Sequence, residues 1–357
     1  MKKNFCLFSA LLFAAVTVFA DEATLIDFTL LNPDIMPNGG GVNTQNRRTV
    51  MDYSMNAGPT FTQDQQSLMK TSLAYEQWVV SLNSSARNTQ AFVNSIVRAA
   101  PVKESAGVPF AGQNVMGVRI LFPTLAANSS ARVTPPIEIP AYEPLSTADE
   151  NGDRATQTPE EKATGLTLFE KGADEAAAFG VVKNVGTIKS ISVTTMGNIY
   201  PHRLYVLLKD ADGIERRYFM GSFEFDGWKE LIWNNSHYIS DVRAREIRVV
   251  PVYPRGMPYA KFVGFEITRD AMKDGGDFIG YFKDVKIIYD RAVLNADRDI
   301  ADEDLWGIIT KRENERQESE MRNFGEKQVN QFIESQLLAT ETDFTSSVVQ
   351  PQQQPQN

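Results

Sequence analysis

Short stretches in which apolar and polar residues alternate run through most of the chain. Met116, Val118, Ile120 and Phe122 alternate with their neighbours, which is the two-residue period of a strand with one buried face. Other runs rich in β-branched and aromatic residues, bounded by Gly, Pro or Asp, predict strands at 23–31, 91–100, 181–182, 188–193, 204–208, 214–220, 246–253, 262–267 and 278–289. No helix is expected between the later strands. The pattern favours an antiparallel β-sandwich of jelly-roll type over residues 21–292.

Three stretches do not read as simple strands. Residues 61–82 fit either a helix or a strand, and the pattern leaves both open. Residues 131–144 hold four of the seventeen prolines, so they predict an edge strand or an extended connection, because proline cannot donate to a sheet ladder. Residues 146–164 are acidic and without periodicity, and we expect a polar surface insertion there.

An aromatic stretch at 223–239 (FEFDGWKELIWNNSHYI) carries the strongest candidate contacts, and its Asp226-Gly227 pair predicts a turn between two apolar runs. Trp228 and Trp233 are an odd number of residues apart, so a regular strand would place them on opposite faces, whereas a turn could change that. Two hypotheses stay open: packing in the core or a subunit interface, or a platform that stacks on sugar rings. Trp228, Trp233 and Tyr238 are the candidate assembly or ligand contacts. We expect Trp228 to be largely buried.

The chain beyond residue 290 changes character. Residues 301–338 contain one glycine and no proline and are dense in Glu, Arg and Gln, which predicts a helix within 295–340. Its middle, 310–320, has no apolar face, so we expect a helix that projects into solvent or binds a partner. The tail at 341–357 ends in QPQQQPQN, a composition typical of disorder.

The first twenty residues are typical of a secretory signal, with Lys2 and Lys3 before an apolar run and cleavage expected after Ala20. The only cysteine, Cys6, lies in that run, so the mature chain would have no disulfide or cysteine-bound metal. No later stretch predicts a membrane anchor. The net charge of -9 argues against a nucleic-acid partner. These features predict an exported, periplasmic protein.

Residues suited to catalysis or metal binding are few. The two histidines, His202 and His237, have no serine elbow nearby and do not predict a triad. Residues 149–153 with Glu160 resemble a calcium loop, but Arg154 replaces the required glycine. Acids on the aromatic stretch, Glu224, Asp226 and Glu230, could in principle act as a glycosidase pair, although nothing singles them out. We therefore expect no catalytic, cofactor-binding or metal-binding residues, and no enzyme.

Several long motifs in order resemble the outer-layer (sheath) proteins of spirochaete periplasmic flagellar filaments: MGVRILFP, PPIEIPAY, NVGTIKSISVTTMGNIYPHRLYVLLKDADG, FDGWKELIWNNSHYI and GDFIGYFKDVKIIYD. The resemblance implies a structural protein that contributes to filament stiffness or shape and to motility. Its implied partners are flagellin core subunits and other copies of itself or other sheath proteins. The implied fold is a jelly-roll (galactose-binding-like) sandwich with a C-terminal helix. The alternative is a periplasmic protein like a carbohydrate-binding module, with an aromatic platform.

Overall fold

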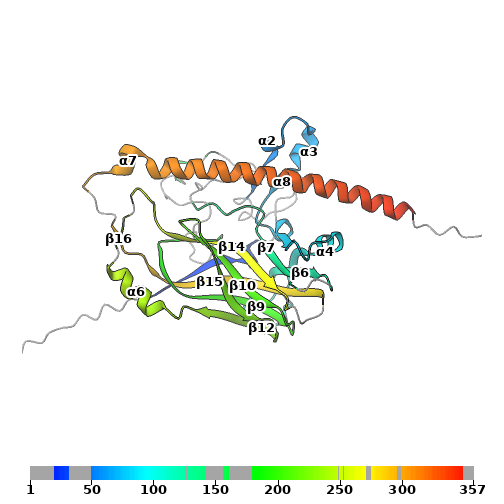
Figure 1. Cartoon of the computed structure of the whole chain (residues 1–357), viewed down its shortest axis with the longest axis horizontal. Coiled ribbons are helices and arrows are strands. Elements are labelled where there is room, and N and C mark those ends of the chain that lie inside the picture. Colours follow the sequence, from blue (N-terminus) through cyan, green and yellow to red (C-terminus); the bar gives the residue numbers. More distant parts are fainter. Residues whose placement is uncertain are drawn as a thin grey trace, which may run out of the picture.

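A computed structural model describes residues 20–31, 50–124, 128–141, 156, 158–160, 179–247, 249–251, 253–270, 275–295 and 299–348. Most of the predicted signal segment, most of the polar insertion, the calcium-like loop at 149–153 and residues 349–357 of the tail lie outside these ranges. The fold is mainly β, as the sequence predicts, with two antiparallel sheets packed face to face and a long C-terminal helix across one side (Figure 1).

The first sheet has the strand order β12-β9-β15-β6-β5, and β1 also pairs with β15. Its members are β1 (Asp21–Asp27), β5 (Ile96–Pro101), β6 (Asn114–Phe122), β9 (Val185–Asn198), β12 (Asp226–Asn234) and β15 (Gly276–Arg291). The pairing of β1 with β15 joins the first and the last long strands of the sandwich, with Asp21 opposite Tyr289.

The second sheet has the order β11-β10-β14-β7-β4, and β8 also pairs with β14. Its members are β4 (Val79–Leu82), β7 (Ser130–Thr134), β8 (Val181–Lys183), β10 (Arg203–Asp210), β11 (Glu215–Ser222) and β14 (Tyr259–Thr268). Two short pairs lie outside the sheets, β2 (Met51–Asp52) with β3 (Lys70–Thr71) and β13 (Val250–Pro251) with β16 (Leu294–Asn295).

Apolar side chains from the inner faces of both sheets form one core. The alternating set Met116, Val118, Ile120 and Phe122 is fully buried, which confirms the predicted strand and its inward face. Phe265 of β14 stacks on Phe282 of β15 at 4.4 Å between ring centroids and so joins the two sheets. Edge-to-face and offset aromatic contacts of this kind add to the free energy of burial.

Short helices lie between the strands, some of them in segments where strands were predicted. They are η1 (Phe28–Leu30), α2 (Ser54–Ala57), α3 (Gln63–Ser67), η2 (Tyr75–Gln77), α4 (Thr89–Asn94) and α6 (Tyr238–Ile247). The prediction of a strand at 91–100 is wrong over α4, because the Asn88 side chain caps the helix by accepting from the Ala91 N–H. The ambiguous stretch 61–82 holds α3, β3, η2 and β4, so both readings are partly confirmed.

The predicted strand at 246–253 is also wrong over most of its length. Helix α6 runs to Ile247, and the strand that follows, β13, has only two residues. Asn235 starts the change of direction, since its side-chain oxygen accepts from the His237 N–H. The Tyr238 hydroxyl then donates to Asp290 at 2.8 Å and ties the start of α6 to the end of β15.

The C-terminal segment forms two helices, α7 (Asp302–Trp306) and α8 (Ile308–Val348), separated by Gly307 in the left-handed conformation. Residues 341–348, which we predicted as tail, are the last turns of α8. No helix among the described residues is long and apolar enough to cross a membrane.

Helix α8 does not simply project from the sandwich. It runs over the side that carries β14 and β7, with α2 and α3 close to its middle (Figure 1). Phe324 is buried against Tyr53, and the Gln328 amide donates to the Pro136 carbonyl oxygen at 3.0 Å. A side chain at Gly325 would meet Asn56, so this glycine permits the close approach of α2. Of the two predicted alternatives, a helix that projects into solvent or one that binds a partner, the first is therefore wrong for this part of α8.

Candidate functional site

Strand β12 contains most of the aromatic stretch, and it is one continuous strand from Asp226 to Asn234. The predicted turn at Asp226-Gly227 is therefore wrong: these residues begin the strand, and Gly227 lies opposite Gly197 of β9. Gly197 has no room for a side chain because Phe225 passes directly over it. The glycines thus allow a close crossing of chains at the start of β12, where the sequence pattern had indicated a hairpin.

Trp228 lies on the outer face of the first sheet, where it is partly buried. Its indole makes an edge-to-face contact with Phe110 at 4.7 Å. Phe110 comes from the connection between β5 and β6, which therefore reaches across this face. In register with Trp228 on the neighbouring strands lie Met196 and then Tyr281, so an apolar row crosses the sheet.

The three aromatic candidates do not form one platform. Trp233 is on the opposite face of β12 from Trp228 and packs on Tyr218 at 4.8 Å, against the core. Tyr238 begins α6, where its hydroxyl is bound to Asp290 and the Lys189 ammonium lies 5.6 Å from its ring. Since the strand is regular, the odd spacing of the tryptophans separates them.

Neither histidine is arranged for catalysis. His202 is buried and stacks on Phe122 at 5.0 Å, and its ring nitrogens have no hydrogen-bond partner among the described residues. Burial, assisted by the Arg269 guanidinium, lowers the pKa of His202 to about 4. His237 is exposed at the start of α6. His202 is thus a neutral core residue.

The candidate acids and metal ligands do not form a site either. Glu224, Asp226 and Glu230 are all exposed to solvent. Among the residues that the structure describes, no group of three or more His, Cys, Asp or Glu side chains is placed to hold a metal ion.

A cluster of charged residues lies between α8 and the second sheet, and the sequence did not reveal it. Lys261 of β14 is only 1% exposed, and its ammonium lies 2.6 Å from Glu138. Lys209 of β10 also donates to Glu138, at 2.6 Å. Burial lowers the pKa of Lys261, although Glu320 of α8 and Glu138 oppose this.

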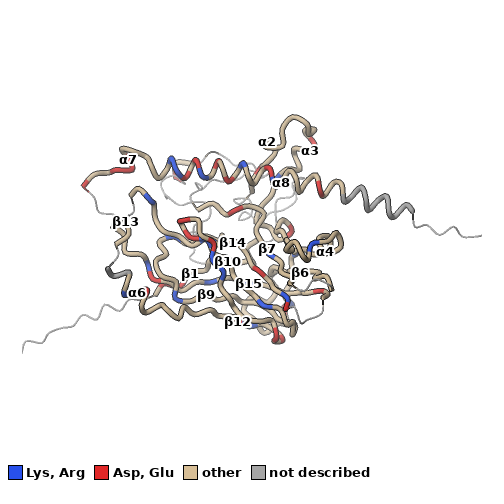
Figure 2. The backbone as a smooth tube through the Cα atoms, viewed as in Figure 1, with Lys and Arg blue, Asp and Glu red and all other residues tan. Residues whose placement is uncertain are grey.

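The polar middle of α8 supplies the other half of this charged cluster. Arg316 donates to the Tyr259 hydroxyl and lies 3.3 Å from Glu320, four residues further along the helix. Burial raises the pKa of Glu320, against the attraction of Lys261. Figure 2 shows acidic and basic residues following one another along this half of α8. The polar middle of α8 thus docks on the second sheet through charged side chains, and the apolar contact of Phe324 follows one turn after Glu320.

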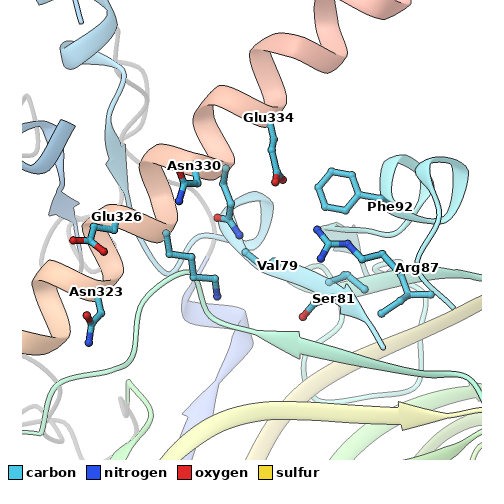
Figure 3. A pocket seen from close by; sticks show the side chains of 12 residues that line it. Val79, Ser81, Arg87, Phe92, Asn323, Glu326, Asn330 and Glu334 are labelled. Atoms are coloured by element: carbon cyan, nitrogen blue, oxygen red, sulfur yellow. The ribbon is translucent and has the colours of Figure 1, made fainter. Parts of the chain in front are cut away.

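A groove of about 470 Å³ lies between α8, α4 and the edge strand β4. Figure 3 shows Arg87 and Phe92 on one wall and Glu334 of α8 facing them from the other. Val79, Leu82 and Phe92 give the groove an apolar part, and Arg87, Lys327, Asn330 and Glu334 give it a polar rim. This mixture of an apolar pocket and a charged rim is typical of a protein-binding site.

Comparison with known proteins gives the family. The model of the family described as flagellar filament outer layer protein, FlaA, matches residues 42–298. A flagellar filament outer layer protein of Treponema pallidum is 53% identical over 347 residues, 97% of each chain. One from Spirochaeta aurantia is 41% identical over 345 residues, 96% of this chain and 95% of its own.

Among solved structures, two carbohydrate-binding modules are similar at low scores. One, from family 61 and in complex with β-1,4-galactotriose, has a TM-score of 0.27 and 11% identity and covers 60% of this chain and 90% of its own. The other, from family 11 and a Clostridium thermocellum cellulase, has a TM-score of 0.26 and 10% identity and covers 62% and 91%. The sequence matches are far more extensive, and on them the chain belongs to the flagellar filament outer layer protein family.

Proposed function

We propose that this chain is exported to the periplasm, loses its first twenty residues, and is laid as a structural subunit on a core of flagellin subunits. There it adds stiffness or shape to the filament and so contributes to motility. The observation that carries this proposal is the 53% identity to a flagellar filament outer layer protein along 97% of both chains. A match of this length includes the sandwich and α8 together.

The site geometry supports contact-making over catalysis. The described histidines and the acids of β12 form no acid-base pair, whereas apolar side chains remain accessible on the outer face of the first sheet. Ile232, two residues from Glu230 on that face of β12, is 50% exposed. We include Trp228 among the assembly contacts of this face. Trp233 and Tyr238 would support the face from within.

The alternative of a carbohydrate-binding protein has less support. A sugar ring stacks on aromatic rings that share one accessible face. Trp228, Trp233 and Tyr238 occupy an outer face, an inner face and a helix, and Phe110 covers part of Trp228.

The test compares filaments purified from cells with and without this chain. We expect the chain to copurify with the filaments, and filaments without it to be thinner and more flexible in electron micrographs. A matched control lacks residues 2–20 and should be retained inside the cell and be absent from the filaments. Filaments of unchanged diameter that never contain the chain would overturn the proposal.

A further inference from the structure

Helix α7 holds exposed apolar side chains in a fixed position. Gly307 donates to the Glu303 carbonyl oxygen at 2.7 Å and closes α7. The Glu303 carboxylate accepts from the backbone N–H groups of Ile309 and Thr310 at 3.0 and 2.9 Å, and so caps the start of α8. These bonds join the two helices into a rigid corner.

Large apolar residues on this corner face solvent. Leu305 is 64% exposed and Trp306 is 65% exposed, and Ile300 just before α7 is 61% exposed. Tryptophans that anchor protein interfaces are the side chains that most often dominate binding energy, particularly when they enter a pocket of the partner. A tryptophan exposed on a rigid element therefore indicates an interface.

The groove beside β4 offers a pocket of suitable character. Its volume of about 470 Å³ is within the range of pockets that enclose small ligands, so an indole fits with room for a neighbouring side chain. Phe92 and Val79 provide apolar surface (Figure 3). Arg87 beside them can stack on an aromatic ring as well as bind a carboxylate.

The charges also favour contact between the α7 corner and the groove. Residues 299–304 of the α7 corner hold Asp299, Asp302 and Asp304 beside the capping residue Glu303 and have no basic residue. In the groove, Arg87 and Lys327 form no ion pair with another described residue. Glu326 and Glu334 also line it: Glu326 is turned away from Arg87 and Phe92 in Figure 3, whereas Glu334 faces them, so the basic side is the wall with Arg87.

The corner and the groove cannot meet within one molecule. They lie toward opposite ends of the sandwich (Figure 1), separated by roughly 20 residues of α8, or about 30 Å at 1.5 Å per residue. We propose that α7 of one copy, with Trp306 as its anchor, docks in the groove of the next copy. The inference rests on the proposed function only in that outer-layer subunits are neighbours. Two different surfaces then make a head-to-tail contact that can continue indefinitely.

Cross-linking tests the contact in the full-length chain with Cys6→Ser, which has no other cysteine. Ala301→Cys, beside α7, and Ser81→Cys, in the groove, are made separately and treated with a short bis-maleimide, because both positions are exposed and neither side chain is needed for the proposed contact. We expect each variant alone to remain monomeric, the mixture to form dimers, and the double variant to form a ladder. Dimers of a single variant, or no dimers in the mixture, would overturn the head-to-tail contact.

A second set of variants identifies the anchor. Trp306→Ala in the double-cysteine chain should reduce the ladder at least about tenfold, as expected for an interface hot spot. The matched control, Met55→Ala, removes a 91% exposed side chain on α2 and should leave the ladder unchanged. Since Trp306 is exposed, its loss should not lower the melting temperature. An unchanged ladder would exclude Trp306 as the anchor.

The two proposals fail separately. Chains that cross-link head to tail in solution but are absent from purified filaments contradict the proposed function and leave the contact standing. Chains that copurify with filaments but give no mixed dimers contradict the contact alone.

Discussion

The two outer faces of the sandwich are covered by different means. Outside the second sheet, Lys261, Glu138 and Glu320 meet under α8, and Arg217 pairs with Glu266 at 3.1 Å nearby. Outside the first sheet, Trp228 begins an apolar row, and the loop with Phe110 reaches over it. Charged side chains hold α8 on the outer face of the second sheet, whereas apolar side chains on the outer face of the first sheet stay partly exposed.

This difference indicates which outer face is covered by the chain itself and which is available to another molecule. A buried charge is tolerated only when its partners are all in place, so the charged face specifies one helix in one position. An apolar face can bind any apolar partner of suitable shape, because the hydrophobic effect is not directional. We infer that α8 is integral to the monomer, whereas the face around Trp228 is available to other molecules.

The largest expected effect comes from Lys261→Met, which keeps the length of the side chain and removes its charge. Glu138 would lose one of its two lysines, and the partly buried Glu320 would lose the attraction of Lys261 and keep that of Arg316. We expect the free energy of unfolding to fall by about 3 kcal/mol in urea titrations, because breaking a buried pair leaves an uncompensated charge.

The matched control for this change is Lys286→Met on the first sheet. Lys286 lies 3.6 Å from an exposed Glu22, so its loss should cost less than about 1 kcal/mol. Equal losses for the two variants would show that the charged face does not depend on its buried lysine.

The pH dependence of unfolding distinguishes the contribution of His202, which is buried in the core, from that of the charged residues under α8. His202 has a pKa of about 4 in the folded protein and an ordinary value of 6.5. Below pH 6.5 the unfolded chain therefore binds a proton at His202 that the folded chain does not bind. The free energy of unfolding falls by about 3 kcal/mol between pH 6.5 and pH 4.

His202→Leu should remove this share of the acid sensitivity, as measured by urea unfolding at pH 7.5 and at pH 4. The charged face should respond less over this range. Burial alone would raise the pKa of Glu138, but Lys261 and Lys209 outweigh it and hold that pKa below its usual value. A variant as acid-sensitive as the parent would contradict the assignment of the effect to His202.

The smallest change in stability is expected on the outer face of the first sheet, around Trp228. Trp228→Ala should lower the free energy of unfolding by about 1–2 kcal/mol, less than the loss for a fully buried aromatic residue, because part of the indole is already in water. The same change should reduce the amount of chain on purified filaments. Ile232→Ala, which does not touch Phe110, should change stability by less than about 0.5 kcal/mol. A Trp228→Ala chain that occupies filaments normally would remove Trp228 from the assembly contacts.

The sequence predicted best where one face of a strand is apolar. The alternation from Met116 to Phe122 gave both the strand and its inward residues. The pattern failed where local hydrogen bonds decide the backbone, as at Asn88 and Asn235, whose side chains begin helices inside apolar runs. Each such cap involves a single polar residue, so it barely alters the hydrophobic periodicity of the sequence.

The docking of α8 could not be predicted for a different reason. Its middle is polar, and its partner Lys261 lies on a strand whose pattern resembles that of any solvated strand. Polar residues at helical spacing, Glu313, Arg316 and Glu320, were the only local signal, and they equally suit a helix in water. The candidate contacts were predicted by residue type, but their separation onto different faces depended on β12 being continuous.

The pairing of β1 with β15 affects when the sandwich can fold. Asp21 follows the expected cleavage point, whereas its partner Tyr289 lies near the end of the sandwich. The strand that is synthesised first therefore cannot pair in its sheet until nearly the whole chain has been made. Contacts so distant in sequence make folding slow. The sandwich therefore cannot close until nearly the whole chain is available, so its folding follows synthesis of the chain and does not accompany it.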